Sequence, residues 1–121
     1  EWGQTLTAGK RTDTAATAPA SGVDFTDVTT AFGMAAYLQV FSFTGTSATM
    51  TIQDSADNAA FAGITGLSAF TAATGITAER IETDTLARTI RQYMKVNTTG
   101  TFTECTFAVM VVRYRGANRE T

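Results

Sequence analysis

The sequence contains no histidine, and it has only one cysteine and one proline in 121 residues. Without histidine the chain has no Ser-His-Asp triad, no imidazole general base and few of the usual zinc-ligand sets. Cys105 has no cysteine partner within the chain, and as a nucleophile it would need a neighbouring histidine. We therefore interpret Cys105 as a small core residue, in a fold that does not depend on an oxidising compartment.

Charge is also scarce, because charged residues make up 17% of the chain and the formal net charge is −2. Basic residues gather only near the end, at Arg113, Arg115 and Arg119, whereas nucleic-acid binding requires a broader positive face. No stretch approaches the roughly 20 apolar residues of a membrane span. The first residues also lack the pattern of a signal peptide. We expect neither nucleic-acid binding nor membrane insertion.

Threonine is abundant, at about a fifth of the residues, and apolar residues reach 44%. Threonine is β-branched and suits a pleated surface. Apolar and polar residues alternate in 48–53 and 89–96, and 102–114 is the most apolar segment. The motifs "TGTS" (44–47) and "NTTGT" (97–101) are typical of turns. Seven or eight short strands at this spacing predict an all-β fold, a single antiparallel β-sandwich of immunoglobulin-like or jelly-roll-like type.

The first part of the chain is poor in large apolar side chains. We interpret residues 1–30 as an extended N-terminal arm or linker, with a first edge strand followed by a loop as the alternative. The sandwich is expected to span 31–116, followed by a flexible tail at 117–121. Trp2 and Leu6 are the apolar side chains expected to anchor the arm during assembly.

A short polar segment after the strand expected at 48–53 is the best candidate for chemistry. Aspartate and asparagine accept hydrogen bonds from backbone N–H groups two residues on and tolerate left-handed φ. We therefore predict a hydrogen-bonded hairpin tip that fixes the register between strands 48–53 and 59–64. Its residues are Asp54, Ser55, Asp57 and Asn58.

Two chemical alternatives involve carboxylates. A Ca²⁺ ion could be held by Asp54 and Asp57 with backbone carbonyls, although the acids lack the alternate spacing of an EF-hand loop. A glycosidase pair could be formed by Asp54 with Asp57, or by Glu79 with Glu82. Exposed ion pairs with Arg80 explain the second pair equally simply. We predict no catalytic residues, no metal site and no cofactor.

Aromatic residues supply another kind of candidate site. Most of them lie in expected strands and should belong to the core. Tyr37 and Tyr93 are the candidates for outward-facing rings that stack on sugars, provided that they share a face. A carbohydrate-binding or adhesion module that contacts host surface glycans is therefore the alternative function.

Several segments, taken in their order, resemble one family. These segments are "YLQV" (37–40), "QDSADN" (53–58), "ERI" (79–81), "RQYMKV" (91–96) and "TGTF" (99–102). On these segments, the chain from about residue 30 to 114 resembles the C-terminal β-sandwich domain of tailed-bacteriophage tail tube proteins and related virion decoration proteins, and residues 2–17 are similar to the preceding linker.

This resemblance implies a non-enzymatic structural role, with a module displayed on the outside of a tail or capsid. It implies other virion proteins as partners, a homo-oligomeric assembly, and a location in the virion after assembly in the bacterial cytoplasm. The family has no catalytic residues to transfer to this chain.

Overall fold

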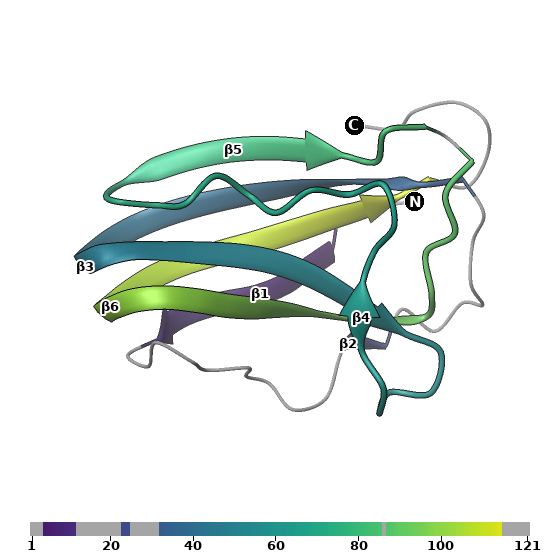
Figure 1. Ribbon diagram of the computed structural model, residues 1–121, viewed down its shortest axis with the longest axis horizontal. Helices are drawn as coiled ribbons and strands as arrows, with labels where there is room; N and C mark the ends of the chain where they lie inside the picture. Colours follow the sequence, from purple (N-terminus) through teal and green to yellow (C-terminus); the bar gives the residue numbers. More distant parts are fainter. Residues whose placement is uncertain (1–3, 12–22, 25–31, 86, 115–121) are drawn as a thin grey trace.

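The computed structural model describes residues 4–11, 23–24, 32–85 and 87–114, whose strands form one antiparallel sheet (Figure 1). Within these ranges there is no helix. The strands are β1 (Gln4–Arg11), β2 (Val23–Asp24), β3 (Met34–Ser55), β4 (Ala62–Gly63), β5 (Thr77–Glu82) and β6 (Tyr93–Arg113). The predicted all-β, antiparallel fold class is confirmed.

Two long strands dominate the sheet. β3 has 22 residues and β6 has 21, and they pair from Met34 opposite Arg113 to Ser55 opposite Tyr93. Both strands bend in the middle, so that the two-stranded ribbon runs outward and then returns over itself (Figure 1). We call residues 34–44 with 104–113 the first arm, and the remaining half of the ribbon the second arm.

Each arm is widened by shorter strands. In the first arm, β1 pairs with β6 on one side and β5 pairs with β3 on the other. In the second arm, β2 pairs with β6 and β4 pairs with β3. The loop before β5 adds a bridge between Ala73 and Ala48. The two arms form layers of a β-sandwich-like fold, although they belong to one curled sheet.

Glycines at the bend allow the two backbones to approach closely. Gly45 has φ 144° and Gly100 has φ 121°, values that side-chain-bearing residues rarely adopt. A Cβ at Gly45 would overlap the Cα of Phe102, and a Cβ at Gly100 would overlap the carbonyl oxygen of Ser47. The ribbon can therefore fold at this point only because both positions lack a side chain.

The segments 44–47 and 97–101, predicted as turns, do change the direction of the chain, but they are not loops that end a strand. Both segments lie within continuous strands and face each other across the bend. The register shifts between Val40 and Ser42 and again on each side of Gly45. Such bulges bend a strand and increase its twist without ending its pairing. The glycines in these segments thus bend β3 and β6, and each strand stays paired through the bend where the sequence predicted two separate strands.

Other boundaries also differ from those predicted. The strand expected at 59–64 contains only the two residues of β4, and the strand expected from Thr89 begins at Tyr93. The described residues contain six strands, compared with the seven or eight expected. β1 and β2 lie within the segment interpreted as an N-terminal arm, and both pair with β6. The expected tail at 117–121 lies outside the described residues.

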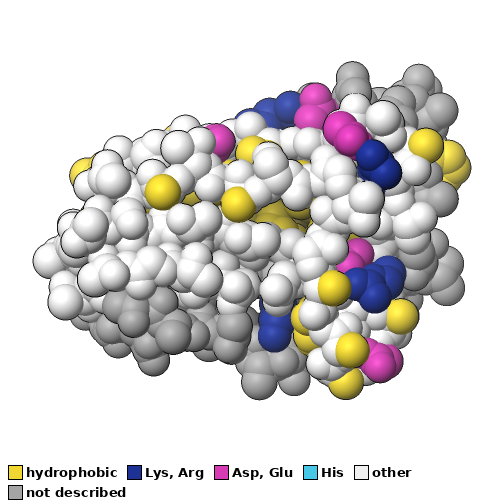
Figure 2. All heavy atoms as spheres, in the orientation of Figure 1, with side chains coloured by type: hydrophobic (Ala, Val, Ile, Leu, Met, Phe, Trp, Pro, Cys, Tyr) yellow, Lys and Arg dark blue, Asp and Glu magenta, His cyan; other side chains and the backbone are white. Residues whose placement is uncertain are grey.

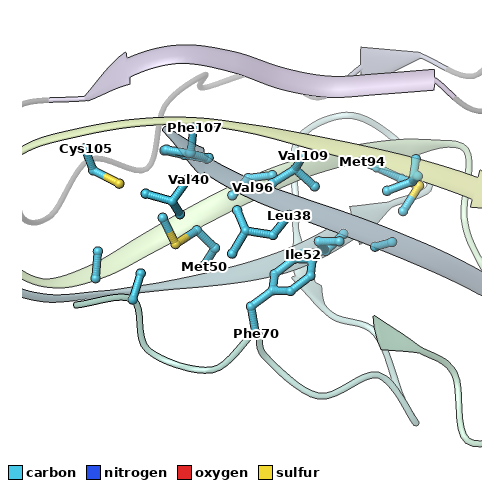
Figure 3. Packing of buried hydrophobic residues seen from close by; sticks show 14 of the residues in the cluster. Leu38, Val40, Met50, Ile52, Phe70, Met94, Val96, Cys105, Phe107 and Val109 are labelled. Carbon is cyan, nitrogen blue, oxygen red and sulfur yellow. The ribbon is translucent and has the colours of Figure 1, made fainter. Parts of the chain in front are cut away.

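The core lies between the two arms (Figure 3). Along most of β3 and β6 buried residues alternate with less buried ones, as the sequence predicts, but all three residues are buried at 34–36 and at 111–113. Cys105 is 0% exposed and belongs to this cluster, in agreement with its interpretation as a core residue. The side chains labelled in the figure that join the arms are Leu38, Val40, Phe107 and Val109 from the first arm, Met50, Ile52, Met94 and Val96 from the second, and Phe70 from a loop.

Replacing Gly45 with alanine should destabilise the fold sharply. The added Cβ meets the backbone of Phe102, and φ at this position is unfavourable for alanine. We expect a loss on the order of 2 kcal/mol or more in the free energy of unfolding, measured by urea denaturation. Gly63→Ala is the matched control, because no atom lies within 4 Å of the added Cβ. Equal losses in the two variants would contradict the role of the bend.

Candidate functional site

The hairpin tip between β3 and β4 is organised around one carboxylate. The hydroxyl of Ser55 donates to Oδ1 of Asp57 at 2.7 Å, and the N–H groups of Ala59 and Ala60 donate to the same oxygen at 3.0 and 3.1 Å. The N–H of Asp57 in turn donates to Oγ of Ser55 at 3.1 Å. Asn58 has φ 60°, the left-handed conformation that asparagine tolerates. Three of the predicted tip residues thus build the reversal together.

These hydrogen bonds lower the pKa of Asp57 from 3.8 to about 2, first through the Ser55 hydroxyl and then through the N–H groups of Ala60 and Ala59. All of these donors favour the ionised carboxylate. Because the folded-state pKa is depressed, the associated stabilisation is present above the ordinary pKa and is lost as the pH falls toward 2. The ionised carboxylate of Asp57 therefore stabilises the turn.

Asp54 does not belong to the tip, which corrects its predicted place there. It is the penultimate residue of β3, and its side chain is 4% exposed. The guanidinium of Arg91 donates to Oδ1 through Nε at 2.9 Å and through Nη2 at 2.6 Å. The backbone N–H of Arg91 donates to Oδ2 at 2.9 Å. Both carboxylate oxygens of Asp54 are therefore held by a residue 37 positions further along the chain.

The carboxylates considered as pairs have separate structural partners. Glu79 accepts hydrogen bonds from the N–H and the hydroxyl of Thr71 at 2.7 and 3.1 Å. Glu82 accepts from Nη2 of Arg80 at 3.5 Å and from the hydroxyl of Tyr114 at 3.2 Å. Among the residues that the structure describes, no three histidine, cysteine or acidic side chains come together as a metal site.

The two tyrosines proposed as sugar-stacking residues do not form one platform. Tyr37 lies on β3 in the first arm, and its neighbours Leu38 and Ala36 point into the core. Tyr93 lies on β6 in the second arm, next to the core residue Met94. Since side chains alternate along a strand and the arms face each other, the two rings lie on opposite outer faces.

The residues proposed as assembly anchors have different outcomes. Leu6 lies in β1, at a register shift between Thr5 and Thr7 in the pairing with β6. Trp2 lies outside the described residues. Their anchoring role stays a prediction.

An open groove of about 720 Å³ runs over the outer face of the first arm. Strands β5, β3 and β6 form its floor, so that it crosses three neighbouring strands. Met110 beside it is 44% exposed. The residues that line the groove are Tyr37, Leu38, Gln39, Ala78, Glu79, Arg80, Ala108, Val109, Met110 and Val112.

A polar chain of contacts borders this groove. Nε of Arg80 donates to the hydroxyl of Tyr37 at 3.3 Å, and the guanidinium carbon lies 5.7 Å from the centre of the Tyr37 ring. Arg80 also pairs with Glu82, whose carboxylate accepts from Tyr114. Sequence reasoning identified Tyr37 and the Arg80 ion pair. It missed the exposed Met110, because a continuous apolar run gives no sign of which residues face outward, and it missed the contact of the buried Tyr114 with Glu82.

Opposite charges tend to lie side by side on the visible surface (Figure 2). Within the described ranges no helix is long and apolar enough to cross a membrane. No family model matches the sequence, and no curated protein matches it. The functional interpretation therefore rests on the residues and their geometry.

Replacing Arg91 with leucine should destabilise the protein by about 3 kcal/mol, because it leaves the buried carboxylate of Asp54 without its guanidinium. Adding Asp54→Asn to this variant should restore part of the loss. Arg88→Leu is the control, since it breaks the more exposed pair with Asp84 and should have a much smaller effect. Urea denaturation of the wild type, Arg91→Leu, Asp54→Asn, the double variant and Arg88→Leu measures these differences, and a strictly additive double variant would contradict the coupling.

Proposed function

We propose that this chain is a non-enzymatic structural module of a bacteriophage virion, a tail tube or decoration domain displayed on the particle surface. The observation that carries the proposal is the apolar outer face of the first arm. Met110 is 44% exposed beside the groove, Phe41 is 56% exposed further along β3, and Ile76 is 75% exposed just before β5. An apolar groove on the outer face of a sheet commonly marks a surface that contacts another molecule.

The use of charge in the described part of the chain supports a structural role. Each described carboxylate accepts a hydrogen bond from within the chain, in a turn, in an ion pair, from a loop or from a neighbouring side chain. Such hydrogen bonds hold the carboxylate side chains in fixed positions, where they stabilise the fold. These acidic residues are Asp24, Asp54, Asp57, Glu79, Glu82, Asp84 and Glu104.

Purified phage particles should contain the chain in many copies, at fixed positions on the tail or the shell in electron micrographs. Phe41→Glu should reduce its incorporation, because the charge falls on the exposed apolar face. Thr99→Glu is the control, since Thr99 is exposed at the bend of the second arm. Mass spectrometry of the particles measures the copy number. A chain recovered only as a free protein would overturn the proposal.

The groove also favours a second candidate function, the binding of host surface glycans. Tyr37 offers a ring at its border, and Gln39 and Arg80 offer polar groups beside an apolar floor. Stacking of a sugar on an aromatic ring would use this arrangement.

A glycan array should then show retention that Tyr37→Ala abolishes. Tyr93→Ala is a matched control, because this ring lies on the opposite outer face. Host adsorption of particles carrying each variant provides an independent readout. An array without signal, or equal loss in both variants, would contradict glycan binding at the groove.

A further inference from the structure

The outer edge of β5 has no strand partner in the part of the chain that the structure describes. β5 pairs with β3 alone among the described strands and forms the upper border of the sheet in Figure 1. The N–H of Thr83 donates to the carbonyl of Met34, directly opposite, at 3.0 Å. In an antiparallel pair the bonded positions alternate. The main-chain groups of Ile81 and Glu79 therefore point to β3, whereas those of Arg80 and Ala78 point outward.

The side chains on this strand form a self-complementary pattern. Arg80 and Glu82 are two residues apart, so both stand on the outer face of the sheet. When two such strands run antiparallel about a two-fold axis at Ile81, Arg80 lies opposite Glu82 of the second copy. The symmetry repeats the same contact, because a two-fold interface uses each pair twice. A shift by two residues in either direction would instead oppose Arg80 to Arg80 or Glu82 to Glu82.

We propose that two copies of this chain associate edge to edge through β5, with the two-fold axis at Ile81. The main chain of Arg80 hydrogen-bonds to the second copy, and its guanidinium pairs with Glu82 across the axis. In the single chain Arg80 and Glu82 are 3.5 Å apart, a long contact that leaves the guanidinium able to reach a second carboxylate. The two outer faces then join into one sheet, and the grooves beside Tyr37 lie on the same side of the dimer.

A contact of this kind is short, and weak association suits it. Six residues of one edge strand supply few hydrogen bonds, so the dimer should form in a concentration-dependent way. On a particle with many copies, weak contacts act together through their effective concentration. The inference rests on the proposed function only in treating the chain as an assembly module.

Charge exchange across the axis tests the pairing. Sedimentation equilibrium of the full chain up to about 1 mM should show a dimer, a range that detects even weak association. Arg80→Glu and Glu82→Arg should each weaken it by about tenfold, because both create two like-charge contacts. The double exchange should return the dissociation constant to within about threefold of the wild type. The double exchange also restores the Arg80–Glu82 pair within each chain. An equimolar mixture of the two single variants restores opposite charges only between copies, so heterodimer formation in that mixture identifies the contact.

Amide hydrogen exchange of the unchanged protein provides a test without substitutions. The N–H groups of Glu79 and Ile81 should be protected at every concentration, because they face β3. The N–H of Arg80 should become protected only as the dimer forms. A protein that stays monomeric at about 1 mM, a double exchange as weak as the single ones, or Arg80 protection independent of concentration would overturn the proposal. If particles contain the chain but no dimer forms in solution, this pairing is rejected and the virion role stands. If the dimer forms but particles lack the chain, the pairing stands and the virion role is rejected.

Discussion

The close approach of two backbones at the bend is the constraint on which the rest of the structure depends. Gly45 and Gly100 have φ values that other residues rarely adopt, and each lies against main-chain atoms of the opposite strand. Hydrogen bonding between β3 and β6 continues through the bend, so one ribbon supplies both layers. The layers are thereby joined through paired strands, and the apolar faces that they bury follow directly from the strand alternation.

Polar contacts hold the ends of the ribbon that lie farthest from the bend. At the end of the second arm, Arg91, just before β6, donates hydrogen bonds to both carboxylate oxygens of Asp54. At the end of the first arm, the N–H of Tyr114 donates to the carbonyl of Gly33 at 2.9 Å, and the N–H of Gly33 donates to the carbonyl of Arg88 at 2.8 Å. A buried ion pair is costly to form, but once formed it penalises any opening that exposes one partner alone.

The sequence predicted local structure better than it predicted contacts between residues far apart in the chain. Threonine content and alternation gave the fold class and the buried faces, because these depend on neighbouring residues. Ser55, Asp57 and Asn58 could be placed in a turn for the same reason. The partner of Asp54 could not be predicted, since Arg91 lies 37 residues away and only the tertiary fold brings them together. Glycine-containing segments predict turns, but a bend within a paired strand and a loop that ends a strand use the same residues, so the sequence does not distinguish them.

The sequence also could not predict which outward-facing side chains share one surface. Periodicity could show that Tyr37 and Tyr93 point away from a core, but it could not show that their arms face each other. The bend puts the two rings on opposite outer faces and leaves Tyr37 beside Arg80 and the apolar groove. Within the described ranges, the first arm combines an apolar floor, a polar border and an outer strand edge in one place. A partner that docks on the face of a sheet gains specificity when it also contacts the strand edge, because main-chain hydrogen bonds at the edge fix its register.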